Sequence, residues 1–330
     1  MVNYRAIIII GWGNGMDWNG RKVAIVGGAG FIGHALAVRL LRSGASVTVI
    51  DDLSAPPLSP VAGELVHEHA EEMTAEQLEN TDVVFHLAAN KSVPRSFRDR
   101  SIKQHNIDMA SRVIQACQDS SVPRVVVASS CEIYGQGSSL PNSEKDEHHP
   151  RSPYAESKSE VEHLILDDEK MRGTNATIVR LFNVYGPGER PDAIVPKLCA
   201  SIVAGEAFPV EGDGHQKRDF SYISTAIDHL VNIAAVPSVP VVNVGSGSST
   251  SVNEIVELVA QKRPHVHIER QNPRQQDIAE FRADTALLNS ISREVNDTSL
   301  SLGLDRTLAW WERKGPDAAR QALTHERNED

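Results

Sequence analysis

Cysteine is scarce in this chain of 330 residues, which contains only Cys117, Cys131 and Cys199. Their number is odd and none belongs to a Cys-x-x-Cys pair, so we expect neither a disulfide framework nor a structural zinc site. The acidic, histidine-bearing segment Glu144–His149 also lacks the ligand spacing that would fix a metal. We expect this segment to be a solvated connection, and we expect no metal centre.

Long apolar runs are missing as well. No stretch approaches the roughly 20 residues of a membrane span. The run Ala6–Ile10 is too short for a signal-peptide core, and no small-residue cleavage site follows it. Together with the cysteine usage, these features predict a cytoplasmic protein without membrane contact.

Basic residues do not predominate, because the formal net charge is −11. A non-specific nucleic-acid binder would show a basic balance, so that class is excluded. A small phosphate-bearing ligand is still compatible with this charge, since it requires only a few local cations. The length allows one large domain with a smaller lobe, or two domains.

From Arg21 onward, short β-rich apolar runs alternate with amphipathic helical patterns. The predicted strands are Lys22–Val26, Ser46–Ile50, Val83–Leu87, Arg124–Ser129, Ala176–Leu181 and Val241–Val244. The predicted helices include His34–Arg42, Asp108–Gln118, Ala155–Leu166, Pro196–Gly205 and Val252–Lys262. The alternation predicts an α/β fold with a Rossmann-type doubly wound parallel sheet. Such sheets bind ligands at the carboxyl ends of their strands.

Three segments are expected along the chain. Residues 1–20 are predicted to be a flexible N-terminal extension. Residues 21–186 are predicted to form the dinucleotide-binding Rossmann domain. Residues 187–330, in which prolines punctuate a looser rhythm, are predicted to form mainly a smaller, loop-rich substrate-binding lobe, with some segments returning to the sheet.

A glycine-rich loop joins the first predicted strand to the first helix, with the sequence Gly27-Gly28-Ala29-Gly30-Phe31-Ile32-Gly33. Gly27 allows a tight turn, Gly30 lets the backbone approach a pyrophosphate, and Gly33 lets the helix lie close to the strand. The amino terminus of the helix supplies N–H donors and partial positive charge to the phosphates. The loop therefore predicts a dinucleotide site.

An acidic residue, Asp51, ends the second predicted strand 18 residues after Gly33. A carboxylate at this place binds the hydroxyls of the adenine ribose and repels a 2′-phosphate, which favours NAD over NADP. Its neighbour Asp52 is expected to assist or to be a bystander.

A Tyr-x-x-x-Lys pair, Tyr154 and Lys158, lies on a predicted helix with a spacing that places both side chains on one face. A lysine charge beside a phenol, together with a cationic nicotinamide, favours the phenolate, so Tyr154 is a candidate proton acceptor. Ser130, at the end of the preceding strand, can share a hydrogen bond with a substrate hydroxyl.

These residues resemble the extended short-chain dehydrogenase/reductase family, in its nucleotide-sugar epimerase/dehydratase branch, over nearly all of residues 21–312. The motifs that carry the resemblance are Gly27–Gly33, His86-Leu87-Ala88-Ala89, Ser130-x-x-x-Tyr134-Gly135, Tyr154-x-x-x-Lys158, Asn183–Gly188 and Gly212–Phe220. The resemblance implies an NAD-dependent enzyme that first oxidises C4 of a UDP-linked sugar. It also implies a homodimer that pairs through helices equivalent to Asp108–Gln118 and Ala155–Leu166.

The same resemblance implies roles for individual residues. Ser130, Tyr154 and Lys158 match the catalytic trio. The residues expected to bind the cofactor are Gly27, Gly30, Phe31, Ile32, Gly33, Asp51, Asp52, Leu87, Ala88, Ala89, Tyr154 and Lys158. Those expected to bind the nucleotide sugar are Lys91, Ser92 and Arg95 in a sugar-contacting loop, Asn183 at the diphosphate, and Arg218 and Arg274 at the nucleotide and its phosphates.

Two further residues, Cys131 and Glu132, indicate the step after the oxidation. A C4 ketone acidifies the C5 hydrogen, which Glu132 can remove, and the protonated thiol of Cys131 can donate to the departing C6 hydroxyl. The pair resembles that of the 5,6-dehydratase type that acts on UDP-N-acetylglucosamine in tunicamycin biosynthesis. Hydride return to C4 would give a 5,6-unsaturated sugar, and return to C6 a 4-keto-6-deoxy sugar.

Other interpretations of the sequence stay open. In a UDP-hexose 4-epimerase, Cys131 and Glu132 would be bystanders, and a UDP-glucuronate decarboxylase would release carbon dioxide. A dinucleotide sensor without catalysis would not need Ser130, Tyr154 and Lys158. Because successive strand residues point to opposite faces, Ser130, Cys131 and Glu132 can share a site only if the strand ends and the backbone turns there.

Overall fold

The computed structural model describes residues 16–136, 139–167, 175–236, 239–263, 266–273, 278–293 and 295–329. A seven-stranded sheet lies at its centre, and its neighbouring strands all pair in parallel. In spatial order the strands are β10 (Val241–Val244), β6 (Asn175–Leu181), β5 (Arg124–Ser130), β4 (Val83–His86), β1 (Lys22–Val26), β2 (Ser46–Asp51) and β3 (Glu64–His67). The order reverses direction at β1, so the predicted doubly wound Rossmann-type fold is confirmed.

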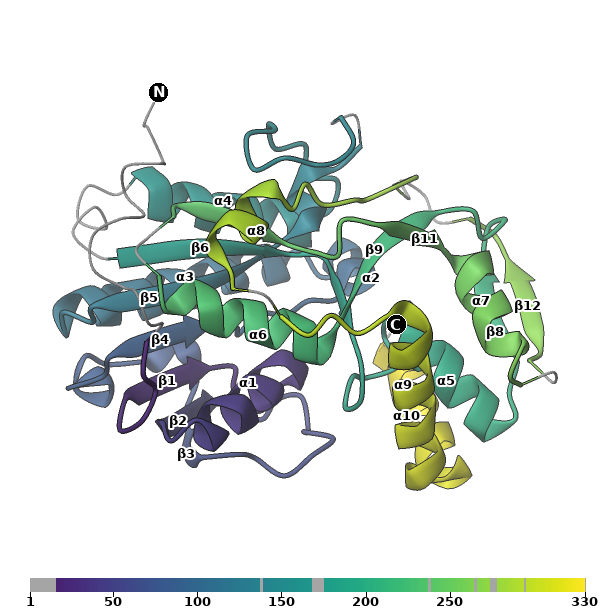
Figure 1. Ribbon diagram of the computed structural model, residues 1–330, viewed down its shortest axis with the longest axis horizontal. Helices are drawn as coiled ribbons and strands as arrows, with labels where there is room; N and C mark the ends of the chain where they lie inside the picture. Colours follow the sequence, from purple (N-terminus) through teal and green to yellow (C-terminus); the bar gives the residue numbers. More distant parts are fainter. Residues whose placement is uncertain are drawn as a thin grey trace.

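Helices cover both faces of this sheet (Figure 1). On one face, α1 (Phe31–Arg42) and α6 (Ile223–Ala234) pack together over residues such as Ile25 and Val49. On the other face, α3 (Ser101–Asp119) and α4 (Pro153–Asp167) pack over residues such as Val26. Because β1 and its neighbours are buried on both sides, their sequences read as continuous apolar runs.

A smaller lobe lies beyond the carboxyl ends of the main strands (Figure 1). Its three-stranded sheet has the order β11 (Ser249–Ser251), β9 (Lys217–Tyr222) and β7 (Asn183–Tyr185), and a two-stranded sheet pairs β12 (Ile268–Gln271) with β8 (Phe208–Glu211). Its helices are α5 (Ile194–Ala204), α7 (Val252–Ala260), α9 (Leu300–Lys314) and α10 (Pro316–Glu329). Because β10 and α6 return to the main sheet, lobe and sheet are interleaved.

The remaining elements are short. They are α2 (Val93–Arg98), α8 (Ala286–Ile291) and the 3₁₀ helices η2 (Ala70–Glu72), η3 (Glu76–Leu78) and η4 (Cys131–Tyr134). Of these, η4 follows β5 without a break and directs residues toward the carboxyl ends of the central strands.

The folded body begins before Arg21. Residues 1–15 of the expected N-terminal extension lie outside the described residues. Trp18 is buried in the main core, and the amide of Gly20 donates to the carbonyl of Gly44 at 2.9 Å. The extension expected over residues 1–20 is therefore wrong for Trp18 to Gly20, because an indole buried against the sheet ties this segment to the domain.

Candidate active site

A cavity of about 1810 Å³ runs along the carboxyl ends of the central strands, between the main sheet and the smaller lobe. It gathers residues from distant parts of the sequence. Those predicted from the sequence and found in its lining are Gly27, Gly30, Phe31, Ile32, Gly33, Asp51, Asp52, Leu87, Ala88, Ala89, Lys91, Ser92, Arg95, Ser130, Cys131, Glu132, Tyr154, Lys158, Asn183 and Arg218. The remaining predicted residue, Arg274, lies outside the described residues.

The glycine loop has the geometry that its sequence predicts. Gly27 has a φ of +81°, and a Cβ there would lie 2.6 Å from the backbone nitrogen of Ala88. A Cβ on Gly33 would lie 2.3 Å from the carbonyl oxygen of Gly27. On Gly30, by contrast, the nearest atom to a Cβ would be that same oxygen at 3.4 Å. A side chain at Gly30 would therefore take up cavity space at the amino terminus of α1.

The two acidic residues at the end of β2 have different surroundings. The Asp51 carboxylate accepts hydrogen bonds from the amides of Ala29 and Leu53, both at 2.9 Å, which places it beside the glycine loop. Asp52 instead accepts from the amide of Ser54 at 2.9 Å and lies 3.2 Å from the Nδ1 atom of His69. Asp51 and the glycine cradle thus lie together in the arrangement typical of a dinucleotide site.

The chain turns sharply where β5 ends. The side chain of Ser130 caps η4 by accepting from the amide of Glu132 at 3.2 Å. After η4, Gly135 has a φ of +59°, and a Cβ there would clash with the carbonyl oxygen of His149. Because the extended backbone stops at Ser130, strand alternation no longer applies, and Ser130, Cys131 and Glu132 all line the cavity.

Helix α4 brings Tyr154 and Lys158 to the same part of the cavity. The Lys158 ammonium donates to the carbonyl of Ala128 at 2.9 Å. Burial lowers the pKa of Lys158 to about 8, although the charge of Glu162 raises it in part. Burial also raises the pKa of Tyr154, against the lowering effect of its hydrogen bond with Ser130. The polypeptide alone therefore keeps the phenol protonated, and the expected phenolate would need the additional charge of a bound cationic cofactor.

The thiol of Cys131 is only 4% exposed and packs in a cluster with Ile133 and Phe281. Burial and the charge of Glu132 raise the pKa of Cys131 well above its ordinary value, while the charge of Arg218 opposes them. Cys131 is therefore a protonated thiol at neutral pH. It can give a proton but cannot serve as a thiolate nucleophile.

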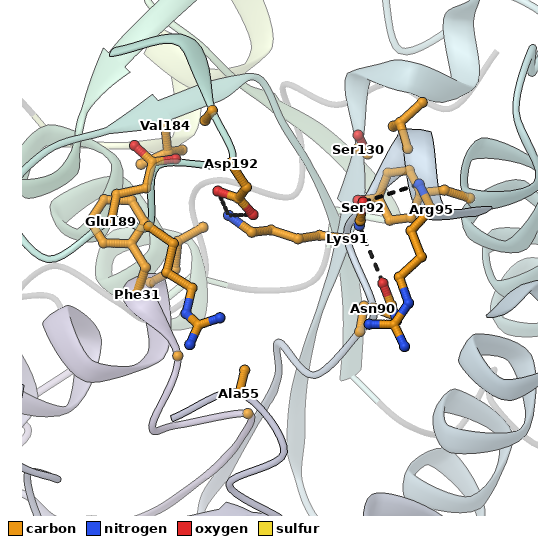
Figure 2. Close-up of a pocket in the computed structure, with 18 of the residues that line it drawn as sticks. Phe31, Ala55, Asn90, Lys91, Ser92, Arg95, Ser130, Val184, Glu189 and Asp192 are labelled. Carbon is orange, nitrogen blue, oxygen red and sulfur yellow. Dashed lines mark hydrogen bonds and ion pairs between the residues drawn. The ribbon is translucent and has the colours of Figure 1, made fainter. Parts of the chain in front are cut away.

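The loop after β4 also supplies polar side chains to the lining of the cavity. Figure 2 shows Lys91 extending across the cavity to Asp192, with nitrogen and oxygen 3.0 Å apart. Ser92 caps α2 by accepting from the amide of Arg95 at 3.2 Å. The Oδ1 atom of Asn183 is buried without a hydrogen-bond partner, as expected of an atom that meets a ligand.

The guanidinium of Arg218 is anchored at the far end of the cavity. Its Nη1 atom donates to the carbonyl of Ile278 at 2.7 Å, and its Cζ atom lies 5.4 Å from the ring centre of Phe281. This anchoring leaves a fixed positive charge beside the cavity, which suits a phosphate-bearing ligand in an otherwise acidic protein.

Several cavity residues were not predicted from the sequence. Glu189 is 4% exposed, its Oε2 atom has no partner, and burial raises its pKa to about 8. Asp192 and Lys197 come from the same loop and from α5, and Glu326 comes from α10. Glu189 directly follows a motif that carried the family resemblance, so its position was a usable signal. Glu326 had none, because it reaches the site only through packing of the last helix.

The segment Glu144–His149, expected to be a solvated connection, is attached to the core. Glu144 accepts from the amide of Asn243 at 2.9 Å, and His148 contacts Arg180 at 2.7 Å and Ser159 at 2.8 Å. That expectation is wrong for Glu144 and His148, whose polar groups serve buried partners, whereas Lys145, Glu147 and His149 are exposed to solvent. Among the described residues, no group of three or more His, Cys, Asp or Glu is placed to hold a metal ion. Within the same residues, no helix is both long and apolar enough to cross a membrane.

Known proteins share this sequence and fold. The model of the NAD dependent epimerase/dehydratase family matches residues 23–245. The structure of TunA, an NAD-dependent NDP-hexosamine 5,6-dehydratase involved in tunicamycin biosynthesis, is 43% identical, covers 90% of this chain and 99% of that one, and superposes with a TM-score of 0.88. MoeE5 in complex with UDP-glucuronic acid and NAD is 32% identical, with 89% and 99% covered and a TM-score of 0.82. The UDP-N-acetyl-alpha-D-glucosaminuronate decarboxylase of Bacillus cytotoxicus is 30% identical over 88% of this chain and 98% of that protein.

Proposed function

Because the chain belongs to the NAD-dependent epimerase/dehydratase family and is therefore an NAD-dependent nucleotide-sugar enzyme, we propose that it is a 5,6-dehydratase of a UDP-hexose, with UDP-N-acetylglucosamine as substrate. The observation that carries this proposal is the turn after β5, which brings Cys131 and Glu132 into the cavity beside Ser130. A plain 4-epimerase needs neither a second base nor a second acid. The likeness to TunA supports the same reaction class.

Tyr154, Lys158 and Ser130 carry the first step in this proposal. Tyr154 accepts the proton of the sugar C4 hydroxyl, and Ser130 hydrogen-bonds the same oxygen. Lys158 supplies the positive charge that favours the phenolate. Bound NAD would supply the hydride acceptor for this oxidation and the hydride donor for the final reduction. The glycine loop and Asp51 would hold it, and the ketone formed at C4 acidifies the hydrogen on C5.

Glu132 and Cys131 carry the second step. Glu132 takes the C5 proton, and the electron pair of that C–H bond forms the C5–C6 double bond as the C6–O bond breaks. Cys131 gives its proton to the departing hydroxide, so one water is released. A proton passed from Glu132 back to Cys131 restores both groups. When C4 is reduced again and Tyr154 reprotonates its oxygen, the product is a 5,6-unsaturated UDP-sugar.

The product identifies the reaction. The purified protein is incubated with UDP-N-acetylglucosamine in deuterated water, and product mass and proton NMR are followed. Loss of one water with a new vinyl signal is the expected result. A methyl signal would mean that hydride returns to C6, and inverted C4 without loss of water would mean an epimerase. Release of carbon dioxide from UDP-glucuronate, with no reaction of UDP-N-acetylglucosamine, would mean a decarboxylase.

A further inference from the structure

A buried ion pair lies directly behind the acid–base residues. Arg180 of β6 and Glu162 of α4 meet through three nitrogen–oxygen contacts, Nη2 to Oε2 at 2.7 Å, Nε to Oε1 at 3.1 Å and Nε to Oε2 at 3.2 Å. The two side chains are 3% and 0% exposed. Glu162 follows Lys158 by four residues on α4, so both side chains lie on one face of the helix. One end of the pair is thus fixed to the catalytic helix.

The other end of the pair is fixed to the catalytic turn. The Nη1 atom of Arg180 donates to the Tyr134 hydroxyl at 2.9 Å, and this hydroxyl donates to Oδ1 of Asn243 at 2.6 Å. The Arg180 Cζ atom also lies 5.0 Å from the centre of the Tyr134 ring. Tyr134 is the last residue of η4, which begins with Cys131 and Glu132. Arg180 therefore touches both elements that carry the reacting groups, without itself lining the cavity.

We propose that Arg180, through Glu162 and Tyr134, is a positioning residue that fixes the turn carrying Glu132 relative to the helix carrying Tyr154 and Lys158. The two bases act on adjacent sugar carbons, so their relative placement decides whether C5 deprotonation follows C4 oxidation. Buried ion pairs contribute little net stability, and fixing one arrangement is the use best attested for them. The part of the inference that concerns Glu132 rests on the proposed function, whereas the part that concerns Lys158 does not.

The two charges of the ion pair are also arranged in a fixed order relative to Lys158. Glu162 lies on the helix of Lys158 and Arg180 lies beyond it, so the negative end of the pair faces the catalytic lysine. Burial lowers the pKa of Lys158, and the charge of Glu162 limits this lowering. His86 of β4 also faces Lys158, and burial keeps it neutral by lowering its pKa to about 3, while the neighbouring Tyr154 phenol is kept protonated by burial as well. Glu162 is thus the acidic charge that keeps Lys158 protonated near neutral pH.

Two more groups contact the pair itself, and one of them, His148, lies within 3.4 Å of Oε2 of Glu162 as well as against Arg180. His148 lies 2.7 Å from Arg180 Nη2, and its other ring nitrogen lies 2.8 Å from Ser159 Oγ. Because the guanidinium can only donate, His148 accepts and is neutral, in agreement with the lowering of its pKa by burial. The carbonyl of Glu144 accepts from Arg180 at 3.1 Å, and the ring of His163 lies behind His148, tilted by 34° with the ring centres 5.3 Å apart. The guanidinium is therefore held from several elements and has one orientation.

Tyr134→Phe tests the positioning directly, because it removes one hydroxyl and keeps the ring. We expect C5 hydrogen–deuterium exchange of the sugar to fall at least tenfold, while single-turnover C4 oxidation, read as NADH absorbance, stays within twofold of the wild type. Tyr185→Phe is the matched control, since Tyr185 is also a buried tyrosine, and its hydroxyl donates to the backbone carbonyl of Leu300 at 3.2 Å. It should change neither rate. An equal fall in both rates for Tyr134→Phe, or no fall in either, would overturn the positioning role.

Glu162→Gln tests the electrostatic orientation. Lys158 acts protonated, so the rate of C4 oxidation should decline as pH rises through the pKa of this lysine. Without the Glu162 charge, that decline should move to lower pH, while the affinity for NAD measured by calorimetry stays unchanged. If the pH profile of the folded variant equals that of the wild type, the proposed effect of Glu162 on Lys158 would be rejected. If Glu162→Gln does not fold, as judged by circular dichroism, Tyr134→Phe still decides the proposal.

The two proposals fail in different ways. Absence of C5 exchange in the wild-type protein would reject the dehydratase function. The pH profile of C4 oxidation would then still test the Lys158 arm, because that oxidation precedes all the reactions of this family. If the wild-type protein exchanges the C5 hydrogen but Tyr134→Phe changes the rates of C5 exchange and C4 oxidation equally, only the positioning role would be rejected.

Discussion

At the scale of single residues, the chemistry depends on where one strand stops. Ser130 is the last residue of β5 and also the cap of η4. Continued as a strand, the chain would point Cys131 to the face opposite Ser130. The 3₁₀ turn instead directs Cys131 and Glu132 to the cavity that also holds Tyr154. A thiol and a carboxylate are thereby placed in the same cavity as the phenol of Tyr154.

Cys131→Ala separates the acid from the base. We expect water loss from UDP-N-acetylglucosamine to slow by roughly 10²- to 10⁴-fold, because that is the usual contribution of a positioned proton donor. C5 exchange with deuterated water should persist, since Glu132 is unchanged. Both are measured in one NMR time course. Unimpaired water loss would show that Cys131 only fills space among Ile133 and Phe281.

At the scale of elements, the join between β1 and α1 combines two glycines with different tasks. Gly33 faces protein, because its Cβ would meet the Gly27 carbonyl at 2.3 Å. Gly30 faces the cavity, where its Cβ would meet only that oxygen at 3.4 Å. Stability and cofactor affinity therefore depend on different glycines of one loop.

Gly33→Ala and Gly30→Ala form a matched pair. Gly33→Ala should lower the free energy of unfolding by about 1–3 kcal/mol or more, because the methyl group meets backbone that cannot yield. Gly30→Ala should cost at most about 1 kcal/mol of stability, the loss of a good capping residue for α1. Its NAD affinity, however, should fall by about 1–3 kcal/mol, roughly 5- to 150-fold. Urea unfolding and calorimetry measure the two quantities, and equal losses of stability would contradict the assignment.

The same elements show what the sequence can predict. β1 was predicted to the residue, because a strand of a parallel sheet that is buried on both faces is a nearly continuous apolar run, and β10 was predicted to the residue from its three valines. The sheet β11–β9–β7 was not predicted, since Ser249–Ser251 is short and polar and Lys217–Tyr222 mixes charges with aromatics. Periodicity carries no signal for such strands.

The residues of the site also fall into those that the sequence predicts and those that it does not. Local spacing was sufficient for the glycine loop and for Tyr154 and Lys158, because one strand or helix sets their geometry. Pairs brought together by the tertiary fold have no such spacing. Glu162 and Arg180 lie 18 residues apart, and Arg180 and Tyr134 lie 46 residues apart, on three different elements. The ion pair behind the active site therefore becomes visible only in the structure.

At the scale of the whole molecule, the C-terminal helices close the cavity from outside. Lys314 of α9 donates to the carbonyl of Leu58, and Arg190 donates to that of Pro56, so the loop after β2 is held from two sides. Arg190 also lies 3.9 Å from Glu326 of α10. Sheet, lobe and C-terminus thus share one wall of the site, which explains why the cavity spans both predicted domains.

The outer surface of α3 and α4 is where we expect a second copy to bind. The family resemblance implies a homodimer through α3 and α4, which pack side by side on the outer face of the sheet. Leu164 of α4 is 43% exposed there, and Leu166 is 40% exposed. Burying such leucines between two copies would stabilise association by about 25 cal/mol for each Å² of apolar surface removed from water.

Leu164→Glu should therefore convert a dimer to a monomer, because it would place a charge in an apolar contact without a partner. Light scattering after size exclusion measures the mass. Leu302→Glu is the matched control, since Leu302 of α9 is 44% exposed on a face remote from α3 and α4, and its mass should equal that of the wild type. A monomeric wild type would reject the dimer outright. If the dimer persists in Leu164→Glu but dissociates in Leu302→Glu, the interface would instead involve the C-terminal helices. It would then adjoin the wall of the active site.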